Sequence, residues 1–317
     1  MKASAPGKII LFGEHAVVYG RPALAVPVTQ VHADVEVLDS SLAGIWIDAP
    51  DINVHAELNT FPSDHPIASA IHNFLFLARI SPFPNLEIKI TSTIPVASGL
   101  GSGAAVTVAV FRALSLHLNH PMTDEEVNAF AYEIEKLHHG TPSGIDNTVV
   151  TYARPVYFIK HPPSPTGRGA GGEVETFNVG QPFMIVIGDT GISAPTKESV
   201  ADVRRLWMND KARWETVFDK IGEISFTARR AIEAGKTEML GELMDENHAL
   251  LQELTVSSPE LDRLVQAARD AGAVGAKMSG GGRGGNMIAS VKPELVESVS
   301  LSLKEAGAKN TINTQVS

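Results

Sequence analysis

A glycine-rich loop that leads into a helix constrains this chain more than any other feature. Residues 95–106 read PVASGLGSGAAV, and apolar residues from Val106 to Leu118 then recur on one helical stripe. Glycines let backbone amides approach an anion closely, and a helix start adds free amides and a positive dipole end. The loop lacks the Lys-Ser or Lys-Thr pair of the common nucleotide loop and the G-x-G-x-x-G spacing of dinucleotide folds. We expect it to hold phosphate with positive charge supplied from elsewhere; a tight strand-to-helix turn without a ligand is the alternative.

Composition narrows the class of protein. The chain has 317 residues, of which 44% are hydrophobic and 20% charged, as in globular proteins with a substantial core. It has no cysteine, which excludes disulfides, thiol catalysis and cysteine-bound zinc. The formal net charge is −10, so nucleic acid is not expected as a partner.

Neither a membrane segment nor a signal peptide is expected. No apolar run approaches the roughly 18 residues that a membrane span needs. The apolar start of the chain is interrupted at Gly13, Glu14 and His15, too early for a signal peptide. We therefore expect a cytoplasmic protein with no membrane partner.

The hydrophobic periodicity predicts strands and helices without regular βαβ alternation, which favours an α+β fold. Strands are expected at 8–12, 22–37, 86–94, 183–189 and 286–291. Helices are expected at 64–80, 103–118, 123–138, 196–221, 223–235, 237–253 and 258–272. The helix at 123 begins with the capping box TDEE, and the last helix has Ser258 as its cap and Gly272 at its end.

The segment 161–173, HPPSPTGRGAGGE, has no periodicity. Its proline and glycine content predicts a flexible loop or the tip of an inserted hairpin. We interpret it as an insertion without a function of its own.

Three glycine-punctuated segments occur along the chain in a recognisable order: APGKIILFGEHAVVYG, PVASGLGSGAAV and KMSGGGRGGN. This triplet resembles the GHMP kinases, and the resemblance covers essentially the whole chain. The stretches HHGTPSGIDN and NHALLQELTVSSPELDRLVQAA make it similar to the mevalonate kinases within that superfamily. The resemblance implies two domains: a ribosomal-protein-S5-like domain at 1–180 and a ferredoxin-like domain at 181–317. It also implies ATP, Mg²⁺ and mevalonate as ligands and allows a homodimer.

The resemblance implies two catalytic residues. Asp146, in SGIDN, matches the base that takes the proton of the acceptor hydroxyl. Lys8 matches the lysine that the family places beside this base, where its positive charge keeps the base ionised. Without the resemblance, Asp146 would be interpreted as a turn former and Lys8 as a solvated charge.

The phosphate and metal positions follow from the same resemblance. The phosphate loop corresponds to Pro95, Val96, Ala97, Ser98, Gly99, Leu100, Gly101, Ser102, Gly103 and Ala104. Glu135 matches the magnesium-binding glutamate, whereas Glu133 lies on another helix face because two residues rotate about 200°. The family commonly has two adjacent serines after G-L-G, and the second binds magnesium; here the pair is Ser102-Gly103. Either Ser102 substitutes as a ligand, or water fills the position and Glu135 holds the metal.

Residues on the substrate side are implied as well. Glu14 and His15 match positions that line the mevalonate pocket, and His15 is expected to donate to a carboxylate or hydroxyl of the substrate. Ser143 and Thr190 are weaker candidates for the same pocket. Arg283 replaces a small residue in the third segment, where it could reach a phosphate, brace the loop or simply point to solvent; a role at the phosphate or in the loop is favoured.

Two other functions stay open at this point. Another small-molecule GHMP kinase, such as a phosphomevalonate or homoserine kinase, would keep the same fold, but a phosphorylated substrate would call for additional Lys or Arg near Glu14 and His15. A ligand sensor without catalysis would have lost the base or its lysine, and both Asp146 and Lys8 are present.

Overall fold

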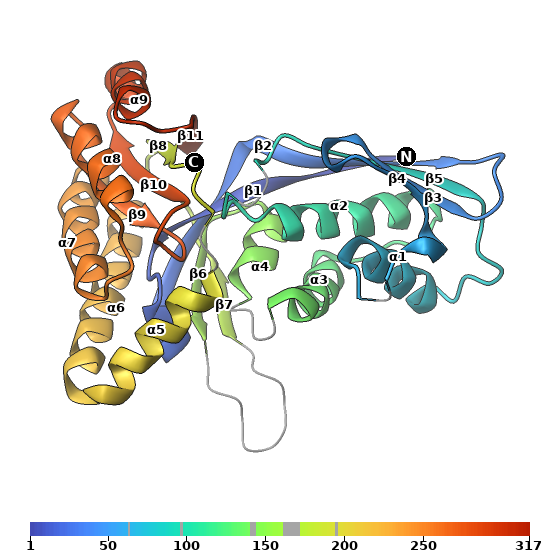
Figure 1. Ribbon diagram of the computed structural model, residues 1–317, viewed down its shortest axis with the longest axis horizontal. Helices are drawn as coiled ribbons and strands as arrows, with labels where there is room; N and C mark the ends of the chain where they lie inside the picture. Colours follow the sequence, from blue (N-terminus) through green and yellow to red (C-terminus); the bar gives the residue numbers. More distant parts are fainter. Residues whose placement is uncertain (63, 96–97, 140–143, 161–171, 194–195) are drawn as a thin grey trace. The chain divides into compact units, whose positions relative to one another are not determined.

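The computed structural model describes residues 1–317 apart from 63, 96–97, 140–143, 161–171 and 194–195 (Figure 1). The chain forms two compact units, each built from several stretches of sequence. The first unit consists of Met1–Gly7, Val31–Val96 and Leu100–Ala153. The second consists of Lys8–Gln30, Ala97–Gly99 and Arg154–Ser317. These units do not follow a single boundary at 180, because the N-terminal strands β1 (Lys2–Phe12) and β2 (Pro22–Asp39) contribute to both.

The strands of the first unit lie beside the C-terminal part of β2. That part pairs antiparallel with β5 (Leu86–Ser92), from Ala33 opposite Ser92 to Asp39 opposite Leu86. Strand β3 (Ile45–Ala49) runs parallel to β5, and β4 (Val54–Glu57) pairs antiparallel with β3. The inward positions of β2 alternate with partly exposed ones, as expected for a sheet covered on one face.

The α-helices in the described part of the first unit are α1 (Pro66–Leu77), α2 (Ser102–His117), α3 (Asp124–His139) and α4 (Ile145–Tyr152). Helix α2 is central, since it contacts the other three and β5. The capping box at the start of α3 is confirmed. The amide of Glu126 donates to Thr123 Oγ1 (3.2 Å), and the amide of Thr123 donates to the Glu126 carboxylate (2.8 Å).

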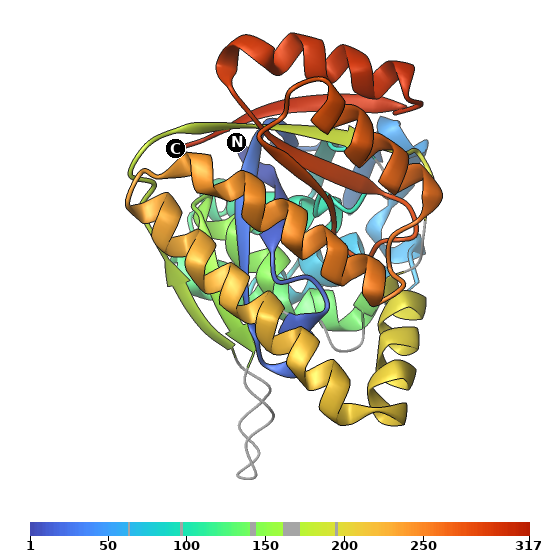
Figure 2. The ribbon, with the colours of Figure 1, turned by 90° about the vertical axis from the view of Figure 1, so that its left-hand side faces the viewer.

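The second unit contains an antiparallel sheet in the order β11-β8-β10-β9, and helices pack along it (Figure 2). Its strands are β8 (Phe183–Asp189), β9 (Gly275–Ser279), β10 (Asn286–Val291) and β11 (Asn310–Val316). Its helices are α5 (Thr196–Asn209), α6 (Lys211–Glu233), α7 (Leu240–Glu253), α8 (Pro259–Asp270) and α9 (Val296–Glu305). Strands β9 and β10 are fully buried and β8 is mostly buried, whereas the edge strand β11 is largely half-exposed, so the inner strands anchor the loops at their ends.

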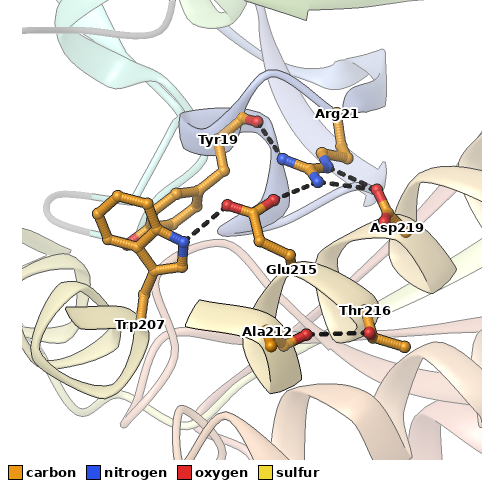
Figure 3. A network of polar contacts seen from close by, with 7 residues as sticks. All are labelled: Tyr19, Arg21, Trp207, Ala212, Glu215, Thr216 and Asp219. Carbon is orange, nitrogen blue, oxygen red and sulfur yellow. Dashed lines mark hydrogen bonds and ion pairs between the residues drawn. The ribbon is translucent and has the colours of Figure 1, made fainter. Parts of the chain in front are cut away.

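Arg21 joins the N-terminal segment of the second unit to α6 (Figure 3). Its guanidinium donates to the carboxylates of Glu215 and Asp219 and to the carbonyl of Tyr19. Trp207 Nε1 donates to the other oxygen of Glu215 at 2.7 Å. Because several bonds share one planar guanidinium, the segment before β2 is held in a fixed register against α6.

Side chains hydrogen-bond to the backbone groups of β9 on the edge that is not paired with β10. The amide of Ala276 donates to Asp245 Oδ1 (3.0 Å), and the amide of Met278 donates to His248 Nδ1 (3.3 Å). Arg269 donates to the carbonyl of Ala276 at 2.9 Å. The backbone groups of an exposed strand edge would otherwise pair with another chain, so this arrangement fixes β9 and the loop that follows it.

The expected elements are largely present, but the boundary between two helices was expected at the wrong place. No break occurs at 222, between the expected helices 196–221 and 223–235. Instead α5 ends at Asn209, and α6 runs without interruption from Lys211 to Glu233. Asp210 is the reason, because its side chain caps α6 by accepting from the amide of Arg213. The cap at Ser258 is confirmed, since its hydroxyl accepts from the amide of Leu261.

The predicted insertion lies between two paired strands. Strands β6 (Val156–Lys160) and β7 (Gly172–Thr176) are antiparallel, with Lys160 opposite Gly172. Residues 161–171 lie outside the described residues. The segment expected to be loop therefore includes the first two residues of β7. In the described ranges, no helix combines the length and the apolar character that crossing a membrane requires.

Candidate functional site

The third glycine-rich segment, residues 277–286, contacts parts of the other two segments within the second unit. It follows β9 and ends in β10, and the sheet holds both ends in place. Ser279 Oγ at its start donates to the carbonyl of Ile10 at 2.7 Å. Residues 14 and 15 contact it at one side, and residue 98 contacts it at the other. The resemblance grouped these segments by order alone, and the structure places these residues against one another.

Glu14 forms an ion pair with Lys277, and both side chains are fully buried. Lys277 Nζ donates to Glu14 Oε1 and to the carbonyl of Met278. Burial raises the pKa of Glu14, opposed by the charge and hydrogen bond of Lys277, and burial lowers the pKa of Lys277. The backbone amides of Glu14 and Gly280 also lower the pKa of this carboxyl, but neither makes a hydrogen bond of ordinary geometry to the buried Oε2, which has no such partner among the described residues.

His15 is buried with 6% of its surface exposed and has an unusual backbone φ of 60°. Its Nε2 lies 3.1 Å from the carbonyl oxygen of Gly281. A carbonyl oxygen only accepts, so Nε2 carries the proton and donates. Burial lowers the pKa of His15 to about 4, and the ring is neutral at pH 7 with an unprotonated Nδ1. Nδ1 has no partner in the described part of the chain, so the donor role expected for His15 is already used on Gly281.

The end of the third segment joins residue 98 of the second glycine-rich segment to the residue that follows β8. Asn286 Nδ2 donates to the carbonyl of Ser98 at 2.5 Å. Thr190 donates to the carbonyl of Gly285 through its amide (2.9 Å) and its hydroxyl (3.0 Å). Thr190 therefore positions the loop, which leaves its expected contact with substrate a prediction.

The third segment uses its glycines and its arginine for packing. A Cβ on Gly282 would collide with the carbonyl oxygen of Val256, and its φ of +78° also disfavours other residues. Arg283 donates to Asp202 Oδ2 at 2.5 Å, and its amide donates to the carbonyl of Val256 at 2.8 Å. Of the roles considered for Arg283, these contacts match bracing of the loop.

The second glycine-rich segment leads into α2, as the sequence predicts. Gly101 caps the helix with a φ of 76°, a conformation that favours glycine. The amide of Ala105 is the first that donates within the helix, to the carbonyl of Gly101 at 2.9 Å. The amides of residues 102–104 precede it and have no intrahelical acceptor, which makes this turn suited to an anion. Val96 and Ala97 lie outside the described residues.

Glu135 lies beside this turn. It is 6% exposed, whereas the side chain of Glu133 is 59% exposed and pairs with Lys136, so the two glutamates face different directions as expected. A Cβ on Gly103 would lie 3.6 Å from Glu135 Oε1, an ordinary contact distance. Ser102 is the first residue of α2 and is partly exposed. A carboxylate and a hydroxyl beside free helix amides fit a magnesium–phosphate group, because Mg²⁺ prefers oxygen ligands and keeps several waters.

The two expected catalytic residues belong to different units. Asp146 lies in the first turn of α4, after Gly144 with a φ of 91°, and is partly exposed. Lys8 lies in β1 with 5% of its surface exposed. Ser143 lies outside the described residues. In the described ranges no group of three or more His, Cys, Asp or Glu is arranged to hold a metal ion.

Sequence reasoning missed Lys277 and Asn286. The sequence around Lys277 contained a usable signal, because a lysine between Ala and Met in a buried strand needs a partner of opposite charge. Asn286 gave a weaker signal, since an asparagine after two glycines is typical of an exposed turn. In the structure Asn286 is 2% exposed, and its Oδ1 has no partner among the described residues.

Comparison with known proteins finds relatives along nearly the whole chain. The GHMP kinases N terminal domain matches residues 67–154, and the GHMP kinases C terminal domain matches residues 228–309. A mevalonate kinase from Pyrococcus abyssi is 37% identical over 325 residues, which cover 96% of this chain and 92% of the relative.

Solved structures agree with this result. The crystal structure of the L. major mevalonate kinase in complex with R-mevalonate has a TM-score of 0.85 and 30% identity, covering 100% of this chain and 95% of that one. The Methanococcus jannaschii mevalonate kinase has a TM-score of 0.83 and 26% identity, covering 100% of this chain and 98% of that one. The chain therefore belongs to the GHMP kinases and, within them, to the mevalonate kinase family.

Proposed function

We propose that this chain transfers the γ-phosphoryl group of ATP to the primary hydroxyl of mevalonate, giving 5-phosphomevalonate and ADP. The similarity to mevalonate kinases over nearly the full length supports the substrates. One observation in the structure supports the chemistry most directly: Glu135 Oε1 faces the first turn of α2, where the phosphate loop ends. An acidic side chain repels phosphate unless a cation lies between them, so this pair points to metal-bound phosphate.

Magnesium would be held by Glu135, with Ser102 as a second oxygen donor. When bound, it supplies positive charge to the phosphate oxygens during transfer. The protein contributes the amides of residues 102–104, which orient the phosphate through the helix start. In this proposal Gly103 provides no side-chain ligand, so water occupies the place of a second serine hydroxyl.

Asp146 is the proposed base for the acceptor hydroxyl. It lies at the start of a short helix and is partly exposed, so a substrate can reach it. Lys8 is proposed to stabilise the negative charge of the base and of the developing alkoxide. The attacking oxygen loses its proton to Asp146 as its bond to phosphorus forms, and ADP leaves as the bond to the γ-phosphorus breaks.

The substrate can be tested with one assay. ADP release is coupled to NADH oxidation, with ATP, Mg²⁺ and one of four acceptors: mevalonate, phosphomevalonate, homoserine or galactose. We expect turnover with mevalonate to exceed that with each other acceptor by at least about 100-fold in kcat/KM, since a misplaced reacting group costs about that much. A preference for phosphomevalonate or homoserine would assign the chain to another activity of the same fold. Background ADP release without acceptor is the control for ATP hydrolysis.

A further inference from the structure

We propose that Lys277 and Gly281 make residues 14 and 15 a hydrogen-bond acceptor pair that recognises the non-reacting hydroxyl of the substrate and not its carboxylate. This inference rests on the proposed function, because mevalonate carries one hydroxyl that is phosphorylated, one that is not, and a carboxylate. Lys277 is then a positioning residue, which acts through Glu14.

Glu14 provides the first of the two acceptors. Lys277 Nζ contacts Oε1, and Oε2 has no partner in the described part of the chain. If the proton of the pair resides on Lys277, the carboxylate is charged and Oε2 accepts. If that shared proton resides on Oε1, Oε2 is a carbonyl oxygen and still accepts. As long as Oε2 itself carries no proton, its hydrogen-bonding character is therefore the same in both cases.

His15 provides the second acceptor. The carbonyl of Gly281 fixes the proton on Nε2, which leaves Nδ1 as a bare acceptor. Gly281 cannot easily be replaced, since a Cβ there would lie 2.7 Å from Thr196 Oγ1. The ring is neutral because burial lowers its pKa to about 4. His15 therefore offers neither a proton nor a charge to a carboxylate.

Two buried acceptors without donors indicate what a ligand must bring. An acceptor removed from water without a partner costs free energy, and a hydroxyl, which has one proton, recovers it at one of the two acceptors or shares the proton between them. A carboxylate has only acceptors at pH 7 and would also be repelled by Glu14. Residues 277 and 281 thus determine which end of the substrate residues 14 and 15 can bind.

Two substrate analogues test whether residues 14 and 15 bind the non-reacting hydroxyl and not the carboxylate. One analogue, 5-hydroxy-3-methylpentanoate, lacks the non-reacting hydroxyl, and the other, the primary amide of mevalonate, lacks the carboxylate charge. We expect the wild-type enzyme to lose about 10- to 100-fold in kcat/KM with the deoxy analogue, the range for a hydrogen bond to a charged group. In Glu14→Gln this loss should shrink to about threefold or less, whereas the loss with the amide should be the same in both enzymes.

Variants of Lys277 separate positioning from folding. Lys277→Met should reduce discrimination against the deoxy analogue as Glu14→Gln does, and Lys277→Arg should retain most of it. If Lys277→Met fails to fold, the double variant Glu14→Gln/Lys277→Met removes both charges and keeps the volume of the buried pair. A melting curve of each variant shows which proteins are folded.

Nitrogen NMR tests His15 without any turnover. In enzyme labelled with ¹⁵N-histidine at pH 7, we expect one ring, absent from the spectrum of His15→Asn, to be neutral with its proton on Nε2. A proton on Nδ1, or on both nitrogens, would overturn the proposal. So would discrimination against the deoxy analogue that is unchanged in Glu14→Gln, or a change confined to the amide. No turnover of mevalonate by the wild-type enzyme would instead refute the proposed function together with this inference.

Discussion

Gly103→Ser restores the hydroxyl that related kinases commonly have beside the metal, and we expect it to lower the magnesium requirement. Residue 103 is the second residue of α2 and is exposed, and glycine is not required there by a positive φ. A Cβ at this position meets Glu135 Oε1 at 3.6 Å, so the side chain fits without displacing a neighbour. Its hydroxyl then lies on the same side as the proposed metal ligand.

The size of the effect follows from replacing one water. A neutral hydrogen bond or oxygen contact contributes about 0.5–1.5 kcal/mol, so half-maximal rate should need about 2- to 10-fold less magnesium. Replacing glycine by serine in a helix also contributes about 0.5 kcal/mol to stability, equivalent to about 1–2 °C in melting temperature. The stability effect arises from the backbone and is independent of the metal.

Gly103→Ala is the matched control. It removes the same backbone freedom and contacts Glu135 with the same Cβ, but it carries no hydroxyl. Initial rates are measured against free magnesium at fixed ATP for the wild-type enzyme and both variants. If the serine and alanine variants have equal magnesium dependence, residue 103 does not face the metal and the assignment of this site is refuted.

Asp146→Asn should lower kcat by about 100-fold or more with little change in KM, since the amide keeps the shape of the side chain but cannot accept the proton. Single-turnover rates measure this effect, and a kcat near that of the wild type would remove Asp146 from the mechanism. Glu135→Gln should raise half-saturating magnesium by more than tenfold, as checked by magnesium titration, whereas Glu133→Gln, an exposed position on the same helix, should leave it unchanged. The free energy of unfolding should fall as pH decreases from about 6.5 towards about 4. Burial lowers the pKa of His248 to about 4, so the unfolded chain binds the proton at a higher pH than the folded chain does. Denaturant melts of His248→Gln should show a smaller fall than those of the wild type, and an equal fall would contradict the role of this ring.

Local signals in the sequence predicted the long helices and five of the strands, but not β3, β4, β6, β7, β9 and β11 or the helices α4 and α9. The bounds of β8 and β10 match the apolar runs at 183–189 and 286–291, because each strand is buried and bounded by turn residues. The expected helix at 196–221 shows that hydrophobic periodicity does not locate a helix boundary, since α5 and α6 are both amphipathic and only the cap at Asp210 separates them. A cap between two helical segments is visible in the sequence but weaker than the pattern around it.

The site was predictable only in part. Helix starts and glycine loops are local features, so the position of Gly101 and the separate faces of Glu133 and Glu135 followed from spacing. The pair of Glu14 and Lys277 did not, because 263 residues separate them and nothing local specifies the partner of a buried lysine. The packing role of Gly282 was hidden as well, since a glycine that avoids a collision and one that admits a phosphate look the same in a sequence.

Transfer of labelled phosphate from γ-³²P-ATP to mevalonate tests the central claim most directly. The wild-type enzyme should convert mevalonate to labelled 5-phosphomevalonate with one ADP formed for each product molecule, and the label should be on the primary oxygen. The Asp146→Asn protein, folded by its melting curve, should form this product at a rate lower by about 100-fold or more. ADP formation with release of labelled inorganic phosphate and unmodified mevalonate would contradict the account.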